Sequence, residues 1–140
     1  EQQEEQEEAP AAVNPQAAIV LAVEAIIALG LGYARGMGQN ETNYNIRAII
    51  NRPGQSQIVR DFGNVVLTYV NFGEAINDAN NMLFENLLIA VQNRFDDLEG
   101  EVDRDIVNAF DGRLRAVGNA RLEIILRRIR GMLNMHDGLL

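Results

Sequence analysis

The sequence predicts an all-α protein, an antiparallel bundle of four to five helices preceded by an extended N-terminal arm. Two observations predict this class. Apolar residues recur at spacings of three and four over most of the chain beyond residue 15, and no segment alternates as a strand does. The chain has 140 residues, of which 47% are hydrophobic, so it can build one core. We divide it into an acidic arm (1–15), an apolar helix with a Gly/Asn/Arg connector (16–54) and a helical bundle (55–140).

The arm is a low-complexity Glu/Gln tract followed by alanines and two prolines. Five acidic residues fall within its first eight positions, in a chain of net charge -8: Glu1, Glu4, Glu5, Glu7 and Glu8. Such a composition is typical of a solvated segment, because it offers little apolar surface to bury. We expect it to become ordered where neighbouring subunits hold it.

The first helix is expected to begin at Pro15, which suits a first turn, and to continue to Ala34. Glu24 alone interrupts its apolar run, so the helix is apolar nearly all round and needs cover from protein or from lipid. A membrane span would place Arg35 on the cytoplasmic side, and Glu24 would cost it about 3 kcal/mol. The glycines that follow, including Gly32 and Gly36, either end the helix or allow a close helix crossing.

A short helix is expected next, ending at Ile50 before the turn Pro53-Gly54. The polar segment before it offers Thr42 or Asn43 as an N-cap, since both side chains can accept a hydrogen bond from the first helical turn. This helix carries the start of the arginine-rich connector.

Three longer helical segments follow. The first has Ser56 as its N-cap and reaches Gly73, and the second covers about Glu74 to Leu98. The third begins near Asp103 and keeps its apolar spacing to Leu133. Asp111-Gly112 and Gly118 are both candidates for a break within it.

The composition argues against an enzyme. All twelve basic residues are arginine, cysteine and lysine are absent, and the chain has one serine (Ser56) and one histidine (His136). Nucleophilic and acid–base catalysis therefore lack their usual groups, and we expect no catalytic residue and no cofactor. The acidic stretch 96–105 lacks the spacing of a calcium loop, and one histidine cannot supply a di-iron bundle, so we expect no metal site.

Arginines concentrate near the C-terminus, with six between residues 113 and 130 against the single Glu123. On a helical wheel, Arg127 and Arg130 lie opposite the apolar stripe, while Arg121 and Arg128 flank it. Arginine suits bidentate contacts with phosphate and ion pairs at interfaces. Two interpretations stay open: these arginines contact phosphates, or they pair with Glu123 and with acids of a neighbouring subunit.

A second basic segment, residues 35–60, holds four arginines against Glu41 and is rich in glycine and asparagine. Asparagine adds neutral donors for phosphates or for subunit contacts. Together the two segments give six candidate nucleic-acid-binding residues: Arg35, Arg47, Arg52, Arg60, Arg121 and Arg128. Nothing in either segment specifies a base sequence.

The arm, the apolar first helix, the connector Asn45-Ile46-Arg47-Ala48-Ile49-Ile50-Asn51-Arg52-Pro53-Gly54 and the cysteine-free bundle together resemble the coat proteins of filamentous and rod-shaped archaeal DNA viruses. In that family, N-terminal helices wrap double-stranded DNA and C-terminal bundles face outward. The resemblance implies that Arg35, Arg47, Arg52 and Arg60 contact DNA, and that Glu24 and the glycines lie at helix crossings. Charge is the difference, because the family's DNA-facing surfaces are basic and this arm is acidic.

The expected function is therefore that of a structural subunit in a helical virion or nucleocapsid. Its expected partners are copies of itself, with room for a second coat subunit, and nucleic acid, which the resemblance implies is double-stranded DNA. Binding would involve phosphates without base readout. Two alternatives remain: a membrane-associated protein with residues 17–34 in lipid, and a soluble helical adaptor.

Overall fold

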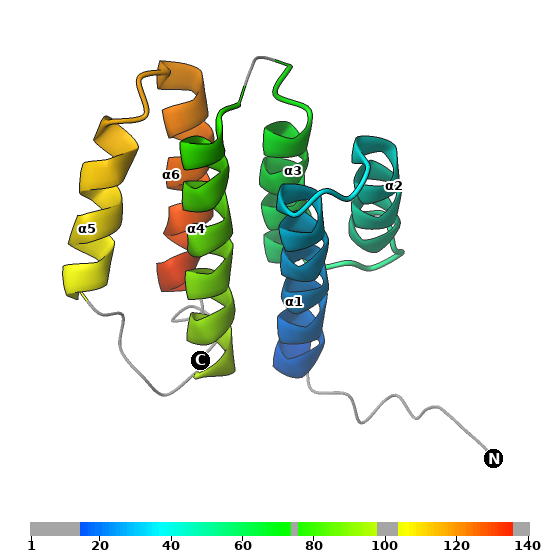
Figure 1. Cartoon of the computed structure of the whole chain (residues 1–140). Helices are drawn as coiled ribbons and strands as arrows, with labels where there is room; N and C mark the ends of the chain where they lie inside the picture. The colour runs from blue at the N-terminus through cyan, green and yellow to red at the C-terminus, as the bar shows by residue number, and fades with distance from the viewer. Residues whose placement is uncertain (1–14, 74–75, 98–103, 136–140) are drawn as a thin grey trace.

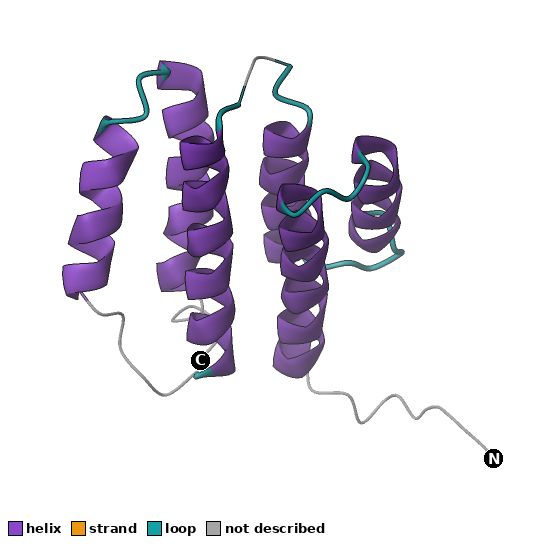
Figure 2. Cartoon of the chain, in the orientation of Figure 1, coloured by secondary structure: helices purple, strands orange, loops and turns teal. Residues whose placement is uncertain are grey.

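A computed structural model describes residues 15–73, 76–97 and 104–135, and within these ranges the chain forms six α-helices and no strand (Figures 1 and 2). The helices are α1 (Pro15–Ala34), α2 (Gln39–Ile50), α3 (Gln57–Val70), α4 (Asp78–Asp96), α5 (Arg104–Arg115) and α6 (Ala120–Met135). The all-α prediction is confirmed, whereas the predicted count of four to five helices is wrong. The arm, the expected start at Glu74, the cap Asp103 and His136 lie outside the described residues.

Successive helices alternate in direction, and four of them form the centre of the bundle (Figure 1). In this centre α1 packs against α4 and α3, and α6 packs against α3 and α4. The two shorter helices lie at opposite sides, with α2 against α1 and α3, and α5 against α6. As a consequence, α3 has α2 on one flank and α6 on the other.

One hydrophobic cluster connects all six helices. Its fully buried members include residues from each helix of the central four: Val23, Ile26, Ile27, Phe62, Val66, Phe84, Leu87, Leu88, Leu126 and Ile129. Aliphatic and aromatic side chains at helical spacing bury one face of each helix, and this burial is the main source of stability.

The apolar helix α1 is only partly covered by the bundle. Val23, Ile26 and Ile27 are fully buried, yet Leu21 on the opposite face is 68% exposed. Residues Gln16–Ala34 have a mean hydropathy of 2.1, and among the described residues this is the one helix long and apolar enough to cross a membrane. The length and composition of this helix would allow it to cross a membrane. They do not require it, because core helices of soluble proteins can have the same length and composition.

Gly118 separates the last two helices. Its φ of +79° is a left-handed conformation that glycine adopts without steric cost, and it follows the end of α5 at Arg115. The predicted break at Gly118 is confirmed, whereas the alternative break at Asp111-Gly112 is wrong because both residues lie inside α5.

Helix starts differ from the predicted caps. The N-cap of α2 is Gly38, and Thr42 lies within the helix, where its hydroxyl donates to the Gly38 carbonyl over 3.0 Å. The Thr42/Asn43 cap prediction is therefore wrong, because both residues lie inside the helix with buried side chains, and the Asn43 side chain bonds to Asn71. Ser56 occupies the predicted N-cap position of α3, but its side chain makes no cap hydrogen bond.

The start of α4 is set by Asn77, which the sequence did not single out. Its Oδ1 accepts a hydrogen bond of 2.8 Å from the backbone N–H of Asn80. An asparagine side chain at this position satisfies one of the unpaired donors of a helix N-terminus. The helix therefore begins at Asp78 rather than at about Glu74.

Candidate nucleic-acid interface

A polar stripe runs along the outer face of α3. Gln57, Asp61, Asn64 and Thr68 are exposed and follow each other at spacings of four, three and four, which places them on one face of the helix. The opposite face is buried in the core. Because α2 and α6 flank α3, this stripe lies between two helices that each contribute an arginine.

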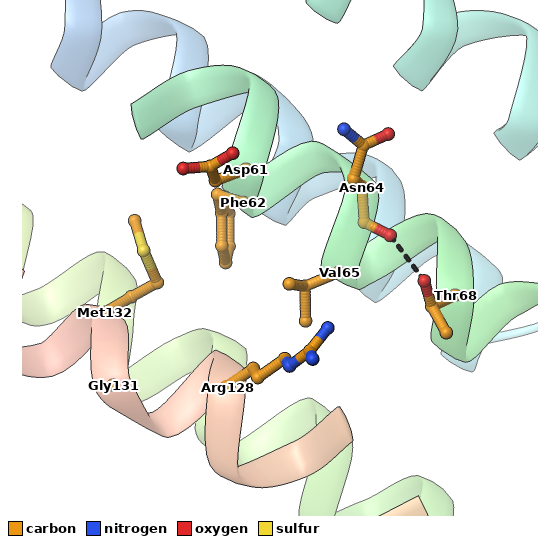
Figure 3. A pocket seen from close by; sticks show the side chains of 8 residues that line it. All are labelled: Asp61, Phe62, Asn64, Val65, Thr68, Arg128, Gly131 and Met132. Carbon is orange, nitrogen blue, oxygen red and sulfur yellow. Dashed lines mark hydrogen bonds between the residues drawn. The ribbon is translucent and has the colours of Figure 1, made fainter. Parts of the chain in front are cut away.

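The first hollow lies between α3 and α6 and has a volume of about 410 Å³ (Figure 3). Figure 3 labels the residues that line it: Asp61, Phe62, Asn64, Val65 and Thr68 from α3, with Arg128, Gly131 and Met132 from α6. Its floor is apolar, since Phe62 and Met132 are buried, and its rim is polar. The Thr68 hydroxyl donates to the Asn64 carbonyl over 2.8 Å, which fixes that side of the rim.

A second hollow of about 440 Å³ lies between α2 and α3 and shares Asn64 and Thr68 with the first. Arg47, Ile50, Asn51, Leu67 and Asn71 complete its lining. The two helices are joined at its end by paired amides: Asn43 Nδ2 donates to Asn71 Oδ1, and Asn71 Nδ2 donates to Asn43 Oδ1, each over 2.8 Å.

A third hollow of about 440 Å³ continues over the outer face of α2 and shares Arg47 and Asn51 with the second. Asn40, Asn43, Tyr44 and Ala48 form the rest of its lining. Tyr44 is 74% exposed, which is unusual for a large aromatic side chain. The three hollows form one continuous surface across α6, α3 and α2, which we call the Arg47–Arg128 band.

The charge of the band is positive, because its lining residues include two arginines and one acid, Asp61. Within the described residues, neither Arg47 nor Arg128 forms an ion pair or a side-chain hydrogen bond. Asp61 accepts a hydrogen bond of 2.7 Å from Gln57, and Gln57 in turn accepts one of 3.3 Å from Arg60. Guanidinium groups beside neutral amides suit a ligand with oxygen acceptors and negative charge.

No family model, curated protein or solved structure matches the chain.

The six predicted binding residues have different environments. Arg47 and Arg128 line the band, Arg52 follows Asn51 in the α2–α3 turn, and Arg60 lies one turn before Asn64 on α3. Arg35 forms an ion pair with Glu85 of α4, away from the band. Arg121 lies over the ring of Phe72, with its guanidinium carbon 4.9 Å from the ring centroid.

The outward placement predicted for Arg127 and Arg130 is wrong. Arg130 turns toward α5, with its Nε 3.1 Å from Asp111 Oδ1, whereas Arg127 pairs along its own helix, with its Nη2 2.7 Å from Glu123 Oε2. Asp111 also lies 3.9 Å from Arg127. The exposed arginines of α6 are therefore Arg121 and Arg128. Intramolecular pairing explains part of the arginine-rich segment, and Arg128, which lines the band, is the residue of α6 left as a candidate for phosphate contact.

Sequence reasoning named Arg47 and Arg128 but missed Asn64, Thr68 and Asn71 as their neighbours. A signal for them exists, because the polar stripe recurs at helical spacing on an otherwise apolar helix. Which helix covers each flank of that stripe depends on tertiary packing. Among the described residues, no three His, Asp or Glu side chains come together as a metal site.

Proposed function

We propose that the protein is a structural subunit of a helical virion or nucleocapsid, which assembles with copies of itself and binds nucleic-acid phosphates without reading base sequence. The Arg47–Arg128 band carries this proposal. It joins two arginines that form no ion pair with any other described residue to a row of asparagine amides, on one continuous surface. Phosphate oxygens accept hydrogen bonds from both kinds of group.

The lack of base specificity follows from the shape of the band. Its members lie on the flanks of packed helices, and neither a protruding helix nor a paired strand is available within the described residues to enter a groove of DNA. Contacts of this kind depend on charge, so affinity should fall steeply with salt concentration.

Self-assembly is supported by the outer face of α1. Ala17, Ala18, Leu21, Ala25 and Ala28 are exposed on it and give a helix surface without charge. Alanine at helical spacing lets a second helix approach closely, and apolar surface left in water favours association. The face lies on a different helix from the band, so assembly and phosphate binding can occur together.

The experiment measures binding to a short DNA duplex of random sequence by fluorescence anisotropy, between about 50 and 200 mM salt. The test variant is Arg47→Gln with Arg128→Gln. The slope of log K, the association constant, against log salt concentration is negative. We expect it to become shallower by about 2 in the variant, since each lost phosphate contact removes roughly one unit of slope. Binding to a second duplex of different sequence should be equal.

The matched control is Arg113→Gln with Arg115→Gln, which removes the same charge from α5. A slope that is unchanged in the control and shallower in the test pair supports the band as the surface that binds phosphates. Equal losses in both would show that binding follows net charge, and a wild-type chain that binds no duplex would contradict the nucleic-acid part of the proposal. Negative-stain electron microscopy, with and without nuclease, checks assembly: dispersed small particles would contradict it.

A second candidate function, membrane association, is favoured by the length and hydropathy of α1. It would require α1 to leave α2, α3 and α4, against which it buries Val23, Ile26 and Ile27. Flotation of the protein with lipid vesicles tests it directly. Recovery with the vesicles would favour this function over a coat subunit.

A further inference from the structure

We propose that the acidic residues 1–8 of the same chain occupy the Arg47–Arg128 band and compete there with nucleic-acid phosphates. This inference deepens the proposed function, on which the identity of the competing ligand depends. The segment lies outside the described residues, and the surface that would receive it lies within them.

Charge complementarity is the first argument. The segment holds five carboxylates and no basic residue in eight positions. The band holds Arg47 and Arg128, and Arg52 and Arg60 border it, against one acid, Asp61, which is already bonded to Gln57. A carboxylate accepts paired hydrogen bonds from a guanidinium much as a phosphate does. The segment and a nucleic acid therefore suit the same groups.

The spacing of charge is the second argument. An extended chain advances about 3.4 Å per residue, so five carboxylates in eight residues place one negative charge every 5–6 Å or so. A strand of B-DNA carries one about every 3.4 Å along its axis. The two densities are of the same order. The remaining residues of the segment, Gln2, Gln3 and Gln6, have amides that can pair with Asn51 and Asn64 of the band.

The position of the segment's attachment is the third argument. Helix α1 begins at Pro15 at the end of the bundle where α3 begins and α6 ends (Figure 1). The α3–α6 hollow extends toward this end, because two of its lining residues are Asp61, near the start of α3, and Met132, in the last turn of α6. Residues 9–14 can span about 20 Å when extended. Packed helices are about 8–10 Å apart and a helix with its side chains is about 10–12 Å wide, so this length of chain can pass from α1 around the first turn of α3 to its outer face.

The consequence is a threshold for phosphate binding. A tethered segment meets its site at an effective concentration of the order of millimolar, and each of its exposed ion pairs is weak. The segment would exclude polyanions that are short or of low charge density from the band, and a long polyanion would displace the segment. An acidic chain can thereby keep a phosphate-binding surface without binding every nucleic acid that it meets.

The first test uses the full chain, which has no cysteine, so that Gln6→Cys provides a single attachment point for a spin label. We expect the label to broaden the NMR signals of the side-chain amides of Asn51, Asn64 and Asn71 at low salt. Asn86 and Asn93, exposed on α4, are the internal reference and should broaden less. Replacing all five glutamates by glutamine should abolish the difference.

Two outcomes would overturn the proposal. Equal broadening of the band and of the α4 reference would show that the segment does not occupy the band. In an equal mixture of spin-labelled chains without ¹⁵N and unlabelled chains with ¹⁵N, selective broadening would show that the occupant comes from a second copy rather than from the same chain. Neither result depends on nucleic acid, so failure of the proposed function would be recognised separately.

The second test compares duplex binding by two variants of equal net charge. Glu7→Gln with Glu8→Gln removes two charges from the segment, and Glu41→Gln with Asp78→Asn removes two exposed charges from the bundle. We expect the first pair to tighten binding by about threefold or more at low salt, the scale of exposed ion pairs, and the second pair to change it less. Equal changes in both pairs would overturn the competition.

Discussion

At the scale of single residues, Tyr69 shows how one buried polar group can join three elements. Its ring stacks on Phe84 of α4 with centroids 3.8 Å apart and planes 8° from parallel. Its hydroxyl donates to Asn81 Oδ1 over 2.9 Å, and Asn81 Nδ2 donates to the Ala34 carbonyl over 3.4 Å. Burial, followed by the charge of Tyr33, raises the pKa of Tyr69, so the phenol stays neutral and remains a donor.

We expect Tyr69→Phe to lower the free energy of unfolding by about 1–2 kcal/mol. The ring and its stack are retained, but Asn81 Oδ1 loses its donor in a partly buried site. Urea unfolding followed by circular dichroism measures the change. Tyr44→Phe is the control, because Tyr44 is largely exposed and should leave stability unchanged. Equal stability of Tyr69→Phe and wild type would show that water replaces the hydroxyl.

A pair of carboxyl groups, Glu24 of α1 and Asp96 at the end of α4, predicts a pH dependence. A side-chain hydrogen bond to Asp96, then burial, then the charge of Asp96 raise the pKa of Glu24 above its ordinary 4.5. The folded chain thus holds this proton to a higher pH than the unfolded chain does. The resulting stability is complete below pH 4.5 and is lost as pH rises through the raised pKa.

We therefore expect Glu24→Gln to flatten this fall and to stabilise the protein at neutral pH by up to about 1 kcal/mol, the scale of partly exposed charge pairs. The glutamine amide can donate to Asp96 without a titratable proton. Asp96→Asn should act in the same way, and the double variant should gain little more, because either change removes the repulsion. Thermal unfolding from pH 4.5 to neutral pH measures these changes. Additive gains in the double variant would show that the two carboxyl groups do not interact.

At the scale of helices, α1, α2 and α3 meet at Gly63, which is buried. A Cβ atom there would lie 2.2 Å from Ile50 Cγ2 and 3.4 Å from Ile26 Cδ1. The close approach of α2 to α3, and with it the shape of the second hollow, depends on the missing side chain. Gly112 in α5 is the opposite case, since no heavy atom lies within 4 Å of its Cβ position.

We expect Gly63→Ala to destabilise the fold by about 1–3 kcal/mol through overpacking. Gly112→Ala should stabilise it by up to about 1 kcal/mol, because alanine loses less backbone entropy in a helix. Both are measured by urea unfolding. A gain in both variants would mean that Ile50 moves aside easily, and the Gly63 crossing would then not fix the position of α2.

Helix periodicity is local, and this explains which elements could be predicted from the sequence. The apolar spacing predicted the helical segments, but it left Asp111-Gly112 and Gly118 as alternative breaks, and the left-handed φ of Gly118 in the structure decides between them. The cap of α2 was mispredicted because Asn43 bonds to Asn71, a partner 28 residues away. Similarly, the wheel of α6 showed an apolar stripe but not which flank would meet Asp111. Pairings between helices decide both features.

At the scale of the whole molecule, the arginine charges are distributed over the folded surface differently from their order along the sequence. The arginine-rich segment 113–130 loses Arg127 and Arg130 to acids of α5 and α6, whereas Arg47 and Arg128, far apart in sequence, come to line one surface. The sequence could name these arginines as candidates. It could not show that α3 lies between them and supplies the amides that connect their two hollows, since that depends on the order in which the helices pack.

The outer face of α1 distinguishes assembly from membrane association. Leu21 is 68% exposed at its centre, so we expect Leu21→Gln to leave the unfolding free energy within about 0.5 kcal/mol of wild type. If α1 packs against another copy, the variant should lose its filaments in electron microscopy and sediment as small particles, because a polar group would have to be buried without a partner.

Met82→Gln, on α4 and 62% exposed, is the matched control and should still assemble. Loss of assembly in both variants would assign the interface to general surface hydrophobicity rather than to α1. If wild-type protein instead floats with vesicles and Leu21→Gln reduces that recovery, the same face meets lipid. The Leu21→Gln variant thus distinguishes assembly from membrane association. Both functions need this alanine-rich surface to be buried away from water, but only assembly needs a second copy of the chain.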